Sequence, residues 1–112
     1  MGFKRKKVIK MERQIKFDVM KEGKKEFLTI NGRKVLRGWE SFNGFYWFAL
    51  EEVQKQDSVI NGKVYKGDQI YYGLCQLHEN EFGDFSETEI KLLGARAWEI
   101  PQRNLVWSGR RN

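Results

Sequence analysis

Apolar and polar side chains alternate over residues 15–19, a period of two that is typical of a β-strand with one solvated face. Residues 21–24 then predict a turn, and a second strand follows over residues 27–30. Asn31-Gly32 predicts a tight hairpin, because both residues tolerate the positive φ angles that such a turn requires. Since residues 33–39 fit a returning strand, the first part of the chain is expected to form an antiparallel β meander.

The second part of the chain carries further strand signals. Six consecutive apolar or aromatic residues, 45–50, indicate a strand that is buried on both faces. Residues 51–58 are polar without a clear period, which fits either a short helix or an excursion loop. Asn61-Gly62 repeats the hairpin signal, and residues 66–68 predict another turn into a strand over residues 69–77.

A helix start is marked at Ser86-Glu87-Thr88-Glu89, where a serine N-cap and a glutamate three residues later form a capping box. Gly94 accepts the left-handed conformation that ends a helix, so we expect a short helix over residues 87–93. Pro101 prevents residues 98–107 from forming one regular helix. Residues 104–107 therefore predict a last strand.

These elements together predict an α+β fold, a mostly antiparallel β meander with one or two short helices. A chain of 112 residues has the size of a single domain. Within it we expect a basic flexible arm over residues 1–7, the meander over 8–40, a β-rich core over 41–107 and a basic tail over 108–112.

Cys75 is the only cysteine, so an intrachain disulfide is excluded, and so are the paired cysteines of a zinc ribbon. This cysteine usage is typical of a reducing cytoplasm. The basic N-terminus lacks the apolar run of a secretory signal, and no segment approaches the roughly 20 apolar residues of a membrane span. We expect a cytoplasmic protein without a membrane partner.

Charge is divided unevenly along the chain. Residues 1–37 hold 13 Lys and Arg against 4 Asp and Glu, a net charge of +9, whereas residues 38–112 have a net charge of −3. Basic side chains neutralise phosphates and release counterions, so this pattern favours nucleic acid or a nucleoprotein complex as the partner. A solvated face that only keeps the protein soluble explains it equally well. The candidate binding residues are Lys4, Arg5, Lys6, Lys7, Lys10, Arg13, Lys16, Lys24, Lys25, Trp39, Arg110 and Arg111.

Trp39 is a candidate because it lies between a glycine and a glutamate, a setting that favours exposure. Tyr46 and Tyr72 could join it in stacking on unpaired bases if their rings are exposed. A small domain needs bulky apolar volume in its core, which explains the remaining tryptophans: Trp47, Trp98 and Trp107.

One cluster has the residue types to hold a divalent metal and activate water: His78, Glu79, Glu81 and Asp84. Its spacing matches no zinc motif, because His78 is the only histidine in the chain. A solvated acidic hairpin loop explains the cluster better, so a metal-dependent nuclease is the least favoured function. Cys75 would need a base nearby to act as a nucleophile, and His78, three residues on, falls on the other face of a strand. We expect no catalytic site, no metal and no cofactor.

Several motifs follow one another in residues 45–107. An aromatic strand ends in acidic residues at Tyr46-Trp47-Phe48-Ala49-Leu50-Glu51-Glu52, and Tyr71-Tyr72-Gly73-Leu74 follows after a loop. Glu81-Phe82-Gly83-Asp84-Phe85-Ser86 opens a short helix, and Ile100-Pro101-Gln102-Arg103-Asn104-Leu105 closes the block. In these motifs the chain resembles a family of small uncharacterised domain-of-unknown-function proteins that are encoded on plasmids, integrative elements and phages. The resemblance implies an origin on a mobile element and an anti-defence or replication-accessory role.

The leading hypothesis is a non-enzymatic binding protein of a phage or mobile element that engages nucleic acid or a nucleoprotein complex through its basic face. Inhibition of a host defence effector of the CRISPR type is a role that such a protein could serve. The alternative is a protein–protein inhibitor or interaction module that acts through an aromatic surface, with its charge serving solubility and steering.

Overall fold

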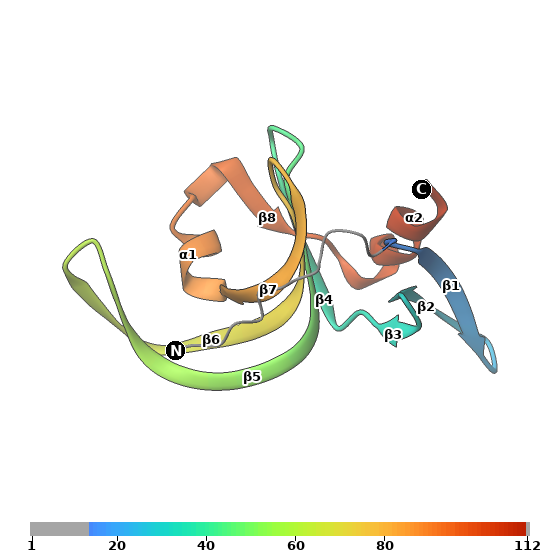
Figure 1. The fold of residues 1–112 in the computed structure, drawn as a ribbon, viewed down its shortest axis with the longest axis horizontal. Coiled ribbons are helices and arrows are strands. Elements are labelled where there is room, and N and C mark those ends of the chain that lie inside the picture. The colour runs from blue at the N-terminus through green and yellow to red at the C-terminus, as the bar shows by residue number, and fades with distance from the viewer. Residues whose placement is uncertain (1–13, 112) are drawn as a thin grey trace.

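The computed structural model describes residues 14–111, and side chains up to residue 107. The described strands form a three-stranded and a five-stranded sheet, against which short helices pack (Figure 1). The predicted α+β fold with mostly antiparallel strands and short helices is confirmed. The expected arm over residues 1–7 lies outside the described residues. No helix in residues 14–111 is long and apolar enough to cross a membrane.

The small sheet has the order β1-β2-β3. β1 (Phe17–Glu22) pairs with β2 (Lys25–Ile30), and β2 pairs with β3 (Arg33–Lys34). The returning strand predicted over residues 33–39 is wrong beyond Lys34, because Arg37–Ser41 belongs to the other sheet. The hairpin turn predicted between β2 and β3 is confirmed, since Asn31 and Gly32 have φ angles of 51° and 81°. Positive φ at both central residues is the geometry that matches the twist of the flanking strands.

The large sheet has the order β7-β6-β5-β4-β8 and is dominated by one long hairpin. β5 (Tyr46–Ile60) and β6 (Lys63–Gln76) turn at Asn61-Gly62, as predicted. The remaining strands β4, β7 and β8 are shorter: Arg37–Ser41, Asn80–Ser86 and Ala97–Glu99. In Figure 1 the outer part of the β5–β6 hairpin, residues 51–69, bends into a curved ribbon that extends away from the rest of the molecule.

Two predictions for this curved ribbon are wrong. Residues 51–58 are neither helix nor loop but continue β5, and residues 66–68 are not a turn but lie within β6. The register between β5 and β6 is interrupted at three places, two with an extra residue on β5 and one with an extra residue on β6 beside Gly67, whose φ is 68°. Each such bulge bends its strand and shifts the alternation of side chains. The sequence therefore shows no period in this segment.

The inner part of the large sheet is buried on both faces, whereas residues 51–57 of β5 are exposed. One face packs against the small sheet and α2, and the buried members of this first core are Leu28, Ile30, Val35, Phe48, Leu50, Leu74, Ile100 and Leu105. The other face packs against α1, and the buried members of this second core are Trp39, Trp47, Ala49, Tyr71, Cys75 and Ile90. Neighbours along β5 alternate between the two cores, as side chains of a strand do. The expected burial of residues 45–50, and of Trp47 among them, is confirmed for 47–50, whereas residues 45 and 46 are half-buried.

α1 (Glu87–Lys91) begins where the capping box predicts, and the Ser86 hydroxyl accepts a hydrogen bond from the Glu89 backbone N–H at 3.1 Å. It ends at Lys91, earlier than the predicted 87–93. Gly94, with a φ of 64°, then opens a single 3-10 turn, η2 (Gly94–Arg96).

α2 (Gln102–Arg111) replaces both the predicted strand over residues 104–107 and most of the predicted tail over 108–112. Residues 98–107 do not form one regular helix, as predicted, since α2 begins only after Pro101. Proline is tolerated at a helix start because it lacks only an N–H that has no partner there. Leu105 and Val106 are buried against the rest of the protein. Tertiary packing of this apolar side stabilises a segment whose local signal is weak.

Candidate nucleic-acid interface

The small sheet and α2 lie together at one end of the molecule (Figure 1). α2 packs against β1 and β2, although the whole large sheet separates them in the sequence. The helix carries Arg103, Arg110 and Arg111 and no acidic residue. Basic segments from the two ends of the described chain therefore meet on one surface, formed by β1–β3 and α2, which we call the basic end.

Acidic residues concentrate elsewhere. Residues 76–99, which include β7, α1 and β8, hold six Asp and Glu against two Lys and Arg. α1 packs on the face of the large sheet opposite to the small sheet. The charge asymmetry of the sequence is therefore also an asymmetry in space.

The described candidate lysines are exposed: Lys16, Lys24 and Lys25. Lys25 lies directly opposite Glu22 in the β1–β2 pair, which offsets part of its charge. Arg110 and Arg111 belong to α2, while their side chains lie outside the described part. The other basic candidates fall outside the described residues: Lys4, Arg5, Lys6, Lys7, Lys10 and Arg13.

Four basic residues of this end were not among the candidates: Lys21 on β1, Arg33 and Lys34 on β3, and Arg103 on α2. Within residues 14–107, no carboxylate oxygen lies within 4.0 Å of the side-chain nitrogens of Lys16, Lys24, Lys34 or Arg103. A cation without a carboxylate partner can neutralise a phosphate without breaking an ion pair first. Lys34 stood within the basic first third of the sequence, whereas Arg103 joins this surface only because its segment is a helix.

Trp39 is the candidate that the structure contradicts. It is 2% exposed and belongs to the second core, with its ring centroid 5.5 Å from that of Tyr71 and 5.8 Å from that of Phe85. The neighbouring Gly38 suggested exposure, but a Cβ there would lie 2.7 Å from a side-chain carbon of Leu105. That glycine reflects close packing, and Trp39 is a core residue that no base can reach.

Two other aromatic predictions are also wrong, because Trp98 is 44% exposed and Trp107 is 63% exposed. Trp98 lies on the edge strand β8, and Trp107 on α2 beside residues that face the core. Tyr46 and Tyr72 are half-buried, and each has a neighbour on its ring. Tyr46 stacks on a phenylalanine at 5.8 Å, and the guanidinium carbon of Arg33 lies 5.6 Å from the Tyr72 centroid.

Arg37 is a basic residue with a structural role. Its guanidinium forms a bidentate pair with Glu99 at 2.7 and 2.8 Å, and donates to Glu87 at 2.8 Å and to the Tyr71 hydroxyl at 2.6 Å. The hydrogen bonds with Glu99 raise the pKa of Arg37, and the same contact lowers the pKa of Glu99. Arg37 therefore holds β4, β6, α1 and β8 together.

The four residues of the predicted metal-binding alternative do not form one group in the fold. His78 and Glu79 precede β7, whereas Glu81 and Asp84 lie on this strand, where alternation directs them to opposite faces. The expected acidic loop is thus partly a strand. The His78 ring packs edge-on against Phe45 with centroids 5.0 Å apart. Within residues 14–107 no three His, Cys, Asp or Glu side chains are grouped so that they could hold a metal ion.

Cys75 is a small buried side chain of the second core. Burial, together with the negative charges of Glu81 and Asp84, raises the pKa of its thiol to about 12. The thiolate is the nucleophilic form of cysteine, so this residue is unreactive in the folded protein.

Asp68 is a carboxylate buried to 1% exposure near the start of α1. It accepts hydrogen bonds from the hydroxyls of Ser58 at 2.7 Å and Ser86 at 2.6 Å, and from the Thr88 backbone N–H at 2.9 Å. Burial alone would raise its pKa, but these three donors lower it. The carboxylate ties the curved ribbon to the N-terminus of α1.

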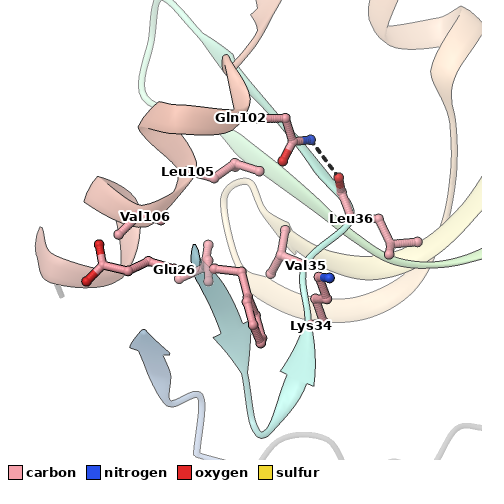
Figure 2. A pocket seen from close by; sticks show the side chains of 9 residues that line it. Glu26, Lys34, Val35, Leu36, Gln102, Leu105 and Val106 are labelled. Atoms are coloured by element: carbon pink, nitrogen blue, oxygen red, sulfur yellow. Dashed lines mark hydrogen bonds between the residues drawn. The ribbon is translucent and has the colours of Figure 1, made fainter. Parts of the chain in front are cut away.

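A cavity of about 300 Å³ opens at the basic end, between α2 and the small sheet (Figure 2). Six apolar residues contribute to its wall: Phe27, Leu28, Val35, Leu36, Leu105 and Val106. Glu26, Lys34 and Gln102 contribute polar groups, and the Gln102 side-chain amide donates to the Leu36 carbonyl at 2.9 Å. An apolar wall with a few fixed polar groups is typical of a ligand site.

Comparison with protein-family models, with curated proteins and with solved structures finds no match to this chain. The resemblance of residues 45–107 to proteins of mobile elements therefore stays a prediction.

Proposed function

We propose that the protein is a non-enzymatic binding protein that contacts nucleic acid, alone or in a nucleoprotein complex, through its basic end. The packing of α2 on β1 and β2 carries this proposal, because it brings basic segments that are distant in the sequence onto one surface. Cations without a described carboxylate partner flank that surface: Lys16, Lys24, Lys34 and Arg103. Each phosphate that such a cation neutralises releases counterions.

The absence of catalysis in this proposal is supported by the state of the reactive side chains. The Cys75 thiol is protonated at neutral pH, and all three hydrogen bonds to Asp68 come from groups of the protein itself. Both residues are buried in the fold.

The test is the salt dependence of binding to fluorescently labelled DNA and RNA. Affinity should fall steeply between about 50 and 200 mM salt, with a slope of log K of about −0.7 to −0.9 per phosphate contact. The variant Lys24→Gln/Lys34→Gln/Arg103→Gln should make this slope shallower by about one for each cation that contacts a phosphate.

A matched control has the same change in net charge at the other end of the molecule. Lys55→Gln/Lys63→Gln/Lys66→Gln lies on the β5–β6 hairpin, whose tip is far from the basic end along the longest axis (Figure 1). It should leave the slope nearly unchanged. Equal effects of both triple variants would mean that only net charge matters, and no binding at about 50 mM salt would end the proposal.

A second candidate function is protein–protein interaction through an aromatic surface, and the exposure of Phe42 and Trp98 favours it. Phe42 is 70% exposed and Trp98 44%. Trp98 lies opposite Glu40, and the Phe42 backbone N–H donates to the Arg96 carbonyl at 2.9 Å, so both rings lie on the β4–β8 edge. A partner captured from a host lysate after nuclease treatment, and lost with Phe42→Ala/Trp98→Ala but not with the basic-end variant, would support this function. We also propose that the protein comes from a phage or mobile element and acts on a host defence effector. Identification of the captured partner tests both proposals.

A further inference from the structure

The cavity of Figure 2 lies within the proposed interface. Its volume of about 300 Å³ is at the lower end of the range for small-molecule sites. That space suits a single planar ring system better than a larger ligand.

The walls of the cavity suit the faces of such a ring. Leu28 and Val35 come from the small-sheet side, and Leu105 and Val106 from α2. Phe27 also lines the cavity and adds an aromatic ring, with the Lys34 ammonium 4.7 Å from its centroid. Bases of every kind have an apolar face that packs on aromatic and aliphatic side chains.

Polar groups at the cavity are placed for the edge of a base. The amide of Gln102 is fixed by its bond to the Leu36 carbonyl, marked by the dashed line in Figure 2. This bond uses one donor of the side chain, so its carbonyl oxygen can accept a hydrogen bond from a ring or amino N–H.

The surrounding charge favours a nucleotide over an apolar side chain of a protein. Lys34 and Glu26, which have opposite charges, line the small-sheet side of the cavity, and Arg103 follows the lining residue Gln102 on α2 without lining the cavity itself. Lys34 at the cavity and Arg103 beside it outnumber this single carboxylate, and the resulting net positive charge complements the phosphates on either side of one nucleotide. A base within a duplex is stacked and paired, so only an unpaired or extruded base can enter such a cavity.

Building on the proposed function, we propose that this cavity receives one unpaired base of a single-stranded nucleic acid whose phosphates contact the basic end. The base inserts between α2 and the small sheet, while Lys34 and Arg103 neutralise the flanking phosphates. The strand is thus bound by its backbone and by one base, without sequence readout along its length.

The experiment compares two strands of equal length and charge, one abasic at every position and one with a single base retained. Because the strand can shift along the basic end, its one retained base can lie at the cavity. This base should raise affinity over that of the fully abasic strand by about 5- to 150-fold, the range of stacking effects for one base. The salt dependence of the two strands should be the same, because they carry the same phosphates.

Val106→Phe fills the cavity and should abolish the advantage of the retained base while leaving the salt dependence intact. Val53→Phe adds the same ring to an exposed valine of β5 (41% exposed) and should keep the advantage. Circular dichroism and thermal denaturation check that both variants fold. If one variant fails to fold, the comparison of the two strands on the unmodified protein still tests the inference. Salt-dependent binding with equal affinity for both strands, or an advantage that survives in folded Val106→Phe, would overturn the inference but not the proposed function. Failure of both strands to bind at about 50 mM salt would overturn both.

Discussion

Replacing Arg37 with methionine should destabilise the protein strongly, although the side chain is partly exposed. Methionine keeps much of the apolar stem and removes the guanidinium, whose hydrogen bonds reach Tyr71, Glu87 and Glu99. The cost depends on what happens to each of these acceptors once the guanidinium is gone.

Tyr71 is 2% exposed, so leaving its hydroxyl without a partner costs about 1–3 kcal/mol. The Glu87 side chain is 12% exposed and loses a charge-assisted bond, but Lys91 stays 3.4 Å away and limits the loss to about 1 kcal/mol. The Glu99 side chain is 40% exposed and returns to water, at a cost of about 0–1 kcal/mol. We therefore expect a loss of about 2–5 kcal/mol, a large part of the roughly 5–15 kcal/mol that stabilises a typical domain.

Urea denaturation followed by tryptophan fluorescence measures the free energy of unfolding. The matched control is Arg33→Met, which removes a pair with Glu51 whose two side chains are 49% and 58% exposed. It should cost at most about 1 kcal/mol. In the Arg37→Met background, Tyr71→Phe should be neutral or stabilising, because it removes the orphaned hydroxyl, whereas in the unmodified protein it should cost about 1 kcal/mol. Equal costs for Arg37→Met and Arg33→Met, or for Tyr71→Phe in both backgrounds, would refute this reasoning.

Three further outcomes follow from the interior of the large sheet. Gly73→Ala should cost more than about 4 kcal/mol in thermal or urea denaturation, because its Cβ would lie 1.8 Å from the Phe48 carbonyl oxygen in the central strand pair. Gly83→Ala, on the register partner in β7 with no atom within 4 Å of the new Cβ, is the control, and a similar cost for both would contradict the argument. Since the pKa of Asp68 is lowered by folding, its carboxylate stabilises the protein above the ordinary Asp pKa of about 4, and this contribution is lost as pH falls through the folded value. Asp68→Asn should flatten the pH dependence of the unfolding free energy below about pH 5, and parallel curves would count against that assignment. Cys75, with a pKa of about 12, should react with a thiol reagent at pH 8 only when the protein opens, and rapid labelling of the folded protein would disprove its burial.

Local chemistry was enough to predict part of this fold. Asn31-Gly32 and Asn61-Gly62 form the predicted hairpins because the signal and the structure involve the same two residues. Ser86 caps α1 for the same reason, since its partner is three residues away. The basic character of one surface also followed from the sequence, although Lys34 and Arg103 did not.

The errors arose where distant contacts decide the structure. Trp39 is buried because it packs on Tyr71 and Phe85 in the second core, which no local pattern indicates. Residues 104–107 are helical because their apolar side packs on the small sheet. The cavity could not be predicted at all, since its walls come from two segments that are some 70 residues apart in the sequence.

The bulges of the curved ribbon have a consequence for how the protein behaves at high concentration. β4 pairs with β5 only as far as Ala49, so from residue 51 onward β5 has no described strand on that side. A long free edge of backbone N–H and C=O groups is a template on which another chain can add a strand. Here register shifts bend the edge, and it carries the charged residues Glu51, Glu52, Lys55 and Asp57. An added strand would have to match the irregular backbone and lie beside these charged side chains. The register shifts that removed the strand pattern from the sequence therefore also disfavour aggregation through pairing of this edge with the edge of another molecule.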